Sequence, residues 1–249
     1  YGGLMSITGT KDTPVKAGMS IADLSAGMFA AFSIVNALLA AQRNGVGQYL
    51  DVSLLDCQVA LLNHMATGYL ATGKYPERMG TAHGTLVPYR SFKAKDQDVV
   101  VAVANDGLWK KFCQALDWVD LLEDERFKLN HQRVALRDEL EPIIEERFKQ
   151  LTSEDIISRL DSYGVPCGPI QNIAQVMNDP QVIARNMMVD IEHPNIPNLK
   201  VPAFPVKFSN TPPTIRNHPP LLGEHTEEIL KSLGYQEEQI EELRSKTII

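Results

Sequence analysis

Hydrophobic positions near the start of the chain follow the spacing of a long helix. Ser20 suits an N-cap, Asp23 stands three residues further on, and an Ala-rich apolar stretch runs to about Arg43. Gly45 comes soon after, and glycine is typical of the position that ends a helix. We therefore predict one helix over this segment and expect its most apolar part, residues 28–41, to be buried.

A strand and a second helix follow. Polar and apolar positions alternate over residues 48–53, which is the period of a half-buried strand. Ser53 and Asp56 repeat the Ser-x-x-Asp start, and a helix is predicted from there to about Leu70. A helix, a strand and a helix at this spacing are typical of α/β proteins, so we assign residues 1–75 to part of a large α/β domain.

The pattern changes over residues 76–150, which we interpret as a small α+β domain. Two apolar runs, residues 86–92 and 98–104, flank a short polar stretch and predict a hairpin. Residues 151–249 form a third, C-terminal segment. The other expected elements are a helix capped by Asn105 or Asp106, helices over residues 132–150 and 152–163, a rigid loop over 165–169, a short helix opened by Asp179-Pro180, strand-like pieces over 188–210 and two short helices over 226–246.

The composition narrows the class of protein. The 249 residues are 44% hydrophobic and 22% charged, which excludes disordered, collagen-like and coiled-coil chains. The net charge of −7, without any block of Lys and Arg, argues against a nucleic-acid partner. No uninterrupted apolar run approaches the roughly 18 residues that span a bilayer, so we expect no membrane association. The 3 cysteines form no CxxC pair, which predicts neither a zinc site nor a disulfide framework and favours a reducing compartment.

The chain opens with Tyr1-Gly2-Gly3-Leu4-Met5 and carries no initiator Met, signal peptide or transit peptide. We therefore expect a fragment whose N-terminal part is missing. The expected compartment is the cytoplasm, or the mitochondrial matrix if the source is eukaryotic.

Two aspartates are candidates for chemistry. Asp23 and Asp56 each place a carboxylate in the first turn of an apolar helix. Such a residue can simply cap the helix and complement its dipole. It can also stand at the edge of a buried site as a nucleophile or base. The spacing does not choose between the two aspartates.

A second candidate is the loop that contains Arg78, Gly80, His83 and Gly84. Glycine lets the backbone approach a ligand closely, and arginine binds carboxylates. The loop can equally be a plain entry to the hairpin, and it matches no phosphate-binding fingerprint. The other histidines are scattered without the spacing of metal ligands, so no metal is expected.

Motifs dispersed over the whole chain resemble one family. They are residues 3–9 (GLMSITG), 23–28 (DLSAGM), 45–48 (GVGQ), 51–56 (DVSLLD), 88–92 (PYRSF), 164–169 (GVPCGP) and 220–226 (PLLGEHT). Together they resemble the family III CoA-transferases of the CaiB/BaiF type, a superfamily that includes formyl-CoA transferase and α-methylacyl-CoA racemase. The stretch GTAHG at 80–84, followed by VPY at 87–89, looks most like the succinate/glutarate-type members.

The resemblance implies a role for each candidate residue. It makes Asp23 the nucleophile, which forms an aspartyl anhydride and then an aspartyl-CoA thioester, and it returns Asp56 to capping. It places Gly80, Gly84 and Tyr89 in a loop that covers the site. It also suggests Arg78 for the distal carboxylate of a dicarboxylate and His83 for a further polar contact.

The family fold implied is an interlocked homodimer. Each chain has a Rossmann-like large domain, to which the C-terminal segment returns, and a small domain, with the site between them. CoA or acyl-CoA is then a substrate, no cofactor is permanently bound, and most contacts to the CoA nucleotide lie in the missing N-terminal part. The implied reaction moves CoA from an acyl-CoA, succinyl-CoA above all, to a carboxylic acid. The alternatives are an acyl-CoA racemase, a hydrolase that uses water as acceptor, and an inactive fragment that serves only in dimerisation or binding.

Overall fold

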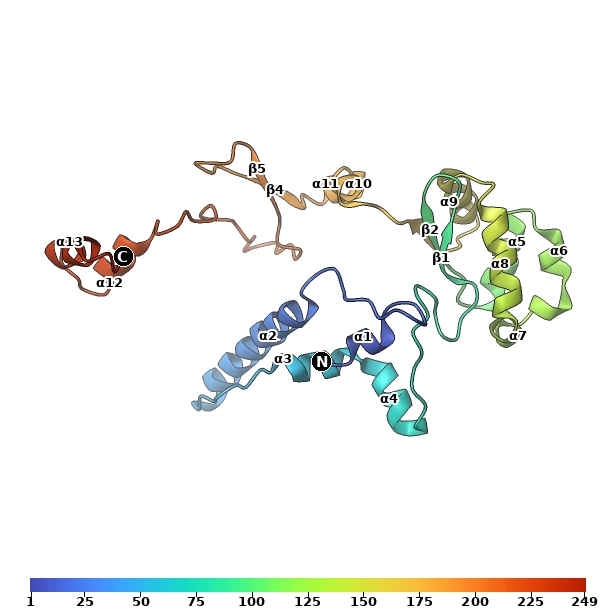
Figure 1. The fold of residues 1–249 in the computed structure, drawn as a ribbon, viewed down its shortest axis with the longest axis horizontal. Helices are drawn as coiled ribbons and strands as arrows, with labels where there is room; N and C mark the ends of the chain where they lie inside the picture. Colours follow the sequence, from blue (N-terminus) through green and yellow to red (C-terminus); the bar gives the residue numbers. More distant parts are fainter. The chain divides into compact units, whose positions relative to one another are not determined.

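The computed structural model describes all 249 residues, and internal contacts divide them into two units, Tyr1–Ile170 and Gln171–Ile249 (Figure 1). The first unit contains α1 (Leu4–Ile7), α2 (Ile21–Asn44), α3 (Leu54–Leu61), α4 (Asn63–Thr72), β1 (Tyr89–Lys93), β2 (Asp98–Ala102), α5 (Asp106–Ala115), α6 (Val119–Glu123), a 3-10 turn η1 (Glu125–Phe127), α7 (Asn130–Ala135), α8 (Arg137–Phe148), α9 (Ser153–Ser162) and β3 (Cys167–Pro169). The second unit contains α10 (Ile173–Met177), α11 (Pro180–Ala184), β4 (Met188–Ile191), β5 (Leu199–Pro202), α12 (Thr226–Ser232) and α13 (Glu237–Ser245). The predicted mixed α/β class is confirmed.

The long helix α2 confirms the helix predicted from Ser20 to Arg43, within one residue at each end. Gly45 ends it in the left-handed region, with φ of 71°, and its N–H donates to the carbonyl of Ala41 at 2.8 Å. The predicted side-chain cap is wrong: the hydroxyl of Ser20 accepts no hydrogen bond from the first turn. The backbone carbonyl of Ser20 instead accepts from the N–H of Leu24 at 3.0 Å.

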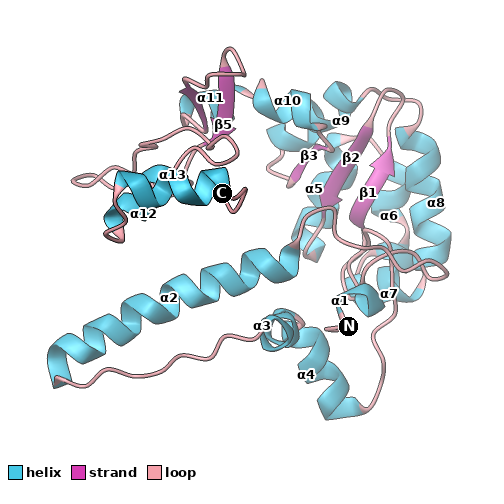
Figure 2. Cartoon of the chain, turned by 60° about the vertical axis from the view of Figure 1, so that its left-hand side comes forward, coloured by secondary structure: helices cyan, strands magenta, loops and turns pink.

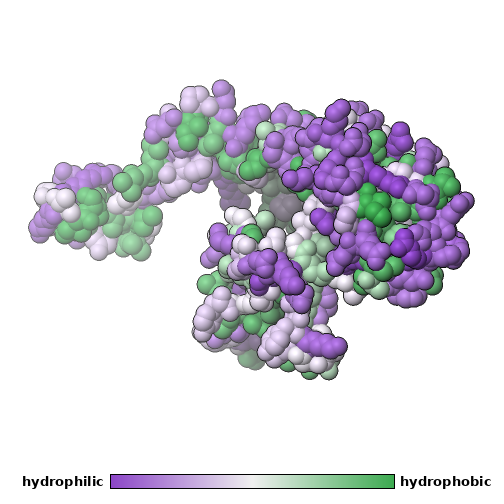
Figure 3. Space-filling model, turned by 45° about the vertical axis from the view of Figure 1, so that its right-hand side comes forward, coloured by the Kyte–Doolittle hydropathy of each residue, from purple (hydrophilic) through white to green (hydrophobic).

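The expected burial of residues 28–41 is wrong for this chain. Only Ser25 is buried in α2, whereas Phe32 and Leu38 are 71% and 59% exposed. The helix packs against α3, and its other sides are left without a covering layer. The space-filling view shows hydrophobic groups at the surface of the lower lobe, where the N-terminal helices lie (Figure 3). Helix α2 also has the length and apolar composition of a membrane-spanning helix, but core helices of soluble proteins and signal sequences share these two properties. The absence of membrane association stays a prediction.

The strand predicted over residues 48–53 does not form. This segment is extended but pairs with no other strand of the chain, and a strand needs a neighbour to satisfy its backbone N–H and C=O groups. The helix predicted after it is confirmed in part. Ser53 caps α3 by accepting from the backbone N–H of Asp56 at 3.3 Å, but a break at Asn63, whose φ is 46°, divides the helix into α3 and α4.

The small sheet contains the predicted hairpin and one strand that was not predicted. Strands β1 and β2 pair antiparallel, with Phe92 opposite Val99, as the two apolar runs indicated. The segment over residues 165–169, predicted as a rigid loop, instead supplies β3, in which Cys167 pairs with Val101. The division at residues 75 and 150 stays a prediction; the contact boundary in this structure lies after Ile170, because β3 belongs to the small sheet.

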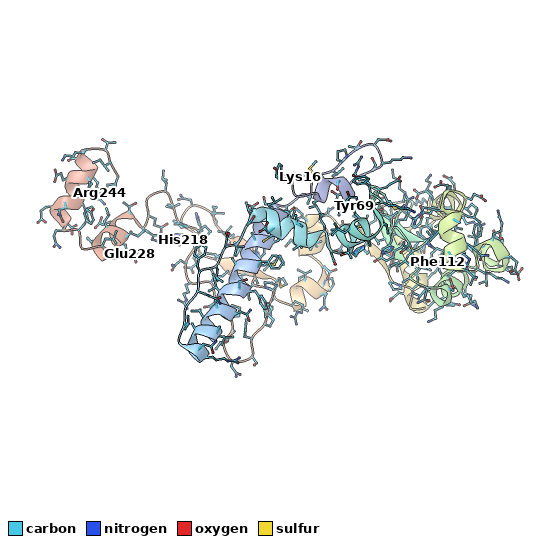
Figure 4. All side chains as sticks on the ribbon, turned by 90° about the horizontal axis from the view of Figure 1, so that it is seen from below. Lys16, Tyr69, Phe112, His218, Glu228 and Arg244 are labelled. Atoms are coloured by element: carbon cyan, nitrogen blue, oxygen red, sulfur yellow. The ribbon has the colours of Figure 1, made fainter.

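Helices α5 to α9 surround this sheet and close a compact core (Figure 2). Asn105 caps α5 as predicted, with its Oδ1 accepting from the N–H of Leu108 at 2.8 Å. Phe112 lies fully buried among these helices (Figure 4), where its ring contacts those of Trp118 and Phe148. The predicted helix over 132–150 is divided at Leu136 into α7 and α8.

The second unit forms the predicted short elements. Asp179 caps α11 by accepting from two backbone N–H groups, and Pro180 occupies the first turn. Strands β4 and β5 pair antiparallel and confirm the strand-like pieces over 188–210. The predicted C-terminal helices are α12 and α13. Glu227 of α12 accepts hydrogen bonds from Lys231 of the same helix and from Arg244 of α13, at 2.6 Å each, and the second bond joins the two helices.

Candidate active site

Asp23 stands in the first turn of α2, where the free backbone N–H groups and the helix dipole favour a negative charge. Its side chain is exposed and lines a cavity of about 230 Å³. The remaining walls come from the first residues of the chain, from residues 16–22 and from Gln58. A carboxylate in this place is open to an electrophile that enters the cavity.

Two polar residues that no motif indicated, Gln58 and Lys16, line the same cavity. The Nε2 atom of Gln58 is buried and donates to no acceptor in the protein, which is uncommon because an unpaired buried amide costs free energy. Lys16 adds an ammonium group from the segment before α2 (Figure 4). Glycine at position 2 lets α3 approach closely, since a Cβ there would collide with the Gln58 side chain. These neighbours arise from tertiary contacts and leave no local signal in the sequence.

A tight turn before α2 connects this cavity to the loop. Gly9 has a φ of 112° and forms a bridge with Pro14. A Cβ at Gly9 would collide with the carbonyl oxygen of Thr13, so only glycine fits. The hydroxyl of Thr8 bonds the carbonyl oxygens of Leu4 at 2.9 Å and Val15 at 2.8 Å. The turn therefore presents a fixed backbone edge.

The beginning of the candidate loop binds to that edge. The N–H of Gly80 donates to the carbonyl of Gly9 at 2.7 Å. The Arg78 guanidinium donates from Nε to the carbonyl of Thr10 at 2.9 Å and from Nη2 to that of Lys11 at 2.7 Å. Arg78 thus holds the loop to the turn, and both N–H groups of Nη1 and one of Nη2 are left for another acceptor. Its predicted contact with a substrate carboxylate stays a prediction.

The end of the loop brings His83 and Tyr89 together. Their rings stack with centroids 5.2 Å apart, and the backbone N–H of His83 donates to the backbone carbonyl of Tyr89 at 2.8 Å. The backbone N–H of Thr85 donates to Nδ1 of His83 at 3.2 Å. Because Nδ1 accepts, the neutral imidazole carries its hydrogen on Nε2. His83 therefore offers one N–H donor in a fixed direction, while Gly84 beside it is exposed.

The predicted site residues thus fall into two groups within the first unit. Asp23 lies at the cavity, and Arg78 and Gly80 anchor the loop to the turn that precedes α2. His83, Gly84 and Tyr89 lie at the other end of the loop, near β1. No hydrogen bond or ion pair joins Asp23 to a loop residue, so the link between the groups runs through the Gly9 turn.

The other candidates have structural surroundings. Asp56 is exposed in the first turn of α3, beside its capping partner Ser53. Burial raises the pKa of the Cys113 thiol to about 12, and it also raises the pKa of Cys167, so neither thiol is activated as a nucleophile. No group of three or more His, Cys, Asp or Glu side chains is placed to hold a metal ion.

Comparison with known proteins places this geometry in a family. A family model described as CoA-transferase family III matches residues 1–226. The chain is 38% identical over 249 residues to the human succinyl-CoA:glutarate CoA-transferase, covering 99% of this chain and 57% of that one. It is 37% identical over 235 residues to the succinate–glutarate CoA-transferase of Agrobacterium fabrum, covering 93% of this chain and 58% of that one.

A solved structure agrees with these relatives. The crystal structure of a CAIB/BAIF family protein from Brucella suis superposes with a TM-score of 0.80 at 37% identity, covering 93% of this chain and 60% of that one. The chain thus spans less than three fifths of the length of the two curated relatives it matches. The motifs, the fold and these matches agree on one assignment: the chain belongs to CoA-transferase family III.

Proposed function

We propose that the protein transfers CoA from an acyl-CoA to a carboxylic acid, with Asp23 as the nucleophile. The observation that carries the proposal is the position of Asp23, in the first turn of α2 and at the wall of a cavity, in a chain of this family. The helix N-terminus stabilises the carboxylate as a nucleophile, and the exposed side chain is accessible to a thioester. CoA is a substrate in this reaction and leaves with the product.

The proposed reaction has four steps that balance. A carboxylate oxygen of Asp23 attacks the thioester carbonyl, the C–S bond breaks, and a mixed anhydride and the CoA thiolate form. The thiolate attacks the Asp23 carbonyl, which releases the donor acid and leaves an aspartyl-CoA thioester. The acceptor carboxylate attacks that thioester to form a second anhydride and release the thiolate. The thiolate then attacks the acceptor carbonyl, which gives the new acyl-CoA and restores Asp23.

Donors in the cavity suit this chemistry. Negative charge develops on the carbonyl oxygen when Asp23 attacks, and a preorganised donor stabilises it. Lys16 offers an ammonium donor on the cavity wall, and Gln58, whose buried Nε2 has no partner in the protein, lines the same cavity. An anhydride must also be kept from water, a task we assign to the loop around Gly80 and Gly84.

We propose a dicarboxylate as the acceptor and succinyl-CoA as the donor. The human and Agrobacterium relatives carry succinyl-CoA or succinate together with glutarate in their names. A second carboxylate finds polar partners in this chain: the free Nη1 of Arg78 and the Nε2–H of His83. We further propose that the protein acts as a homodimer in the cytoplasm or mitochondrial matrix, without a membrane or nucleic-acid partner.

Trapping of the intermediate tests the proposal. The full-length protein is incubated with succinyl-CoA and then treated with hydroxylamine or borohydride, and its peptides are mapped by mass spectrometry. A hydroxamate or a reduced side chain at Asp23, absent in Asp23→Asn, is the expected result. The same variant should lose transfer about 10³-fold or more, because no carboxylate remains to form the anhydride.

Other outcomes would support the alternatives. Exchange of the α-proton of a 2-methylacyl-CoA without modification of Asp23 would indicate a racemase. Loss of the thioester without any acceptor acid would indicate a hydrolase. Binding of CoA without turnover by the full-length protein would indicate a binding module. Asp56→Asn is the matched control, because Asp56 also lies in the first turn of a helix but outside the residues that line the cavity.

A further inference from the structure

Three polar side chains of α7 and α8 bind the backbone of the loop that carries His83, and a fourth pairs with one of them. Asn130, Arg133, Arg137 and Glu141 follow one another at intervals of three or four residues, which places them on one side of a helical segment. Helices α7 and α8 contribute two of these residues each. We call these four residues the loop clamp.

Arg137 binds the turn at His83 itself. Its Nη2 donates to the carbonyl of His83 at 2.6 Å and to that of Gly84 at 3.4 Å. Its Nη1 pairs with Oε1 of Glu141 at 2.9 Å, and the side chain is only 13% exposed. A charged donor on two successive carbonyls limits the rotation of the peptide unit between them.

The side-chain amide of Asn130 binds the next part of the loop through both its nitrogen and its oxygen. Its Nδ2 donates to the carbonyl of Thr85 at 2.8 Å, and its Oδ1 accepts from the N–H of Val87 at 3.2 Å. Thr85 is the residue whose N–H holds Nδ1 of His83. Asn130 therefore fixes the residue that orients the imidazole.

Arg133 and Glu141 complete the clamp. Arg133 is fully buried and donates from Nε to the carbonyl of Val87 at 2.7 Å, while its Nη2 pairs with Asp106 at 2.9 Å. Glu141 bonds Arg137 through one carboxylate oxygen and Arg90 of β1 through the other, at 2.9 Å each. The carboxylate of Glu141 thus connects α8 to β1, the strand that follows the loop.

We propose, on the basis of the proposed function, that Arg137 and Asn130 are positioning residues that direct the Nε2–H of His83 toward a carboxylate of the acceptor acid. Tyr89 fixes the plane of the imidazole, Thr85 occupies Nδ1, and the clamp holds the backbone on which both contacts depend. Nε2–H is then the one ring donor left for a ligand. In this proposal neither Arg137 nor Asn130 contacts the substrate itself.

Steady-state kinetics on the full-length protein test the proposal, with KM measured separately for the acceptor dicarboxylate and for the donor acyl-CoA. Arg137→Met should raise the acceptor KM about tenfold, which corresponds to about 1.4 kcal/mol, and leave the donor KM within about twofold. Arg137→Lys should recover part of the loss, because an ammonium can still donate to the His83 carbonyl. The matched control is Arg147→Met, since Arg147 also lies on α8 and pairs with a carboxylate, Asp120, but does not touch the loop.

Several results would overturn it. An acceptor KM for Arg137→Met within about twofold of wild type would do so, as would an equal rise in Arg147→Met or an equal rise in both KM values. If Arg137→Met does not fold, Asn130→Asp decides, because it keeps the acceptor for Val87 and replaces the donor to Thr85 by a negatively charged oxygen. An unchanged acceptor KM in that variant rejects the proposal. A wild-type protein that moves no CoA would instead reject the proposed function.

Discussion

Arg78 donates from its Nε atom to the backbone carbonyl of Thr10 at 2.9 Å, across 68 residues of the chain. The bond, with its companion to Lys11, ties the start of the loop to the turn that precedes α2 and Asp23. Arg78, together with the bond from Gly80 to Gly9, therefore connects the loop with the proposed acceptor contacts to the segment that leads into the helix of the proposed nucleophile. An arginine predicted to bind substrate has a demonstrated structural role.

Arg78→Ala should have two separable effects. Loss of the two charge-assisted hydrogen bonds should lower the free energy of unfolding by about 1 kcal/mol, since the side chain is only half-buried. If Nη1 also binds the distal carboxylate, the KM for a dicarboxylate should rise more than that for a monocarboxylate of the same chain length. Thermal unfolding measures the first effect and parallel kinetics the second. An unchanged dicarboxylate KM would leave Arg78 with the structural role alone.

Gly9→Ala should open the turn before α2. The backbone there has a positive φ and a Cβ would meet the carbonyl of Thr13, so the segment must shift and the bond from Gly80 to Gly9 is strained. We expect a loss of about 1–3 kcal/mol in the free energy of unfolding, together with slower transfer. Gly18→Ala is the control, because a Cβ at Gly18 meets no atom within 4 Å. Equal chemical denaturation midpoints for the two variants would contradict the prediction.

Phe112→Ala should strongly destabilise the core that helices α5 to α9 form with the small sheet. The side chain is fully buried among Trp109, Trp118 and Phe148, and its removal leaves a cavity among rigid rings. Truncations of this kind cost about 3–5 kcal/mol. Chemical denaturation followed by tryptophan fluorescence reports it directly, because both tryptophans adjoin the site. Tyr163→Ala, at a position that is 45% exposed, should change the stability by less than about 0.5 kcal/mol.

Glu227 should titrate at unusually low pH. Hydrogen bonds from Lys231 and Arg244 lower the pKa of its carboxyl to about 2. A depressed folded-state pKa means that the carboxylate stabilises α12 and α13 above the ordinary value of 4.5 and that this contribution is lost as the pH falls from there toward 2. NMR titration of the side-chain carboxyl gives the midpoint. Lys231→Met should move that midpoint upward, and a wild-type midpoint near 4.5 would contradict the ion-pair geometry.

Much of the local structure was predictable because its causes are local. Gly45 ends α2, Asn105 caps α5, and Asp179 with Pro180 opens α11, each within a few residues of the signal that indicated it. The hairpin of β1 and β2 was predictable for the same reason, since its strands are close in sequence. Pairing of distant segments is not predictable in this way: local signals indicate a loop at β3, because the strand that pairs with it lies more than 60 residues upstream.

The candidate site shows the same difference between local signals and contacts of distant segments. Local patterns are enough to place Asp23 at a helix start and to identify the glycine-containing loop with His83, and the motifs indicate the family. The surroundings of these residues depend on contacts between distant segments: the unpaired amide of Gln58, the bonds from Arg78 to the turn at Gly9 and the loop clamp. The hydrogen bonds of Arg78 and of the loop clamp join segments about 45–70 residues apart. Each forms between a side chain and a backbone carbonyl that only the folded chain brings together, so no local pattern in the sequence predicts it.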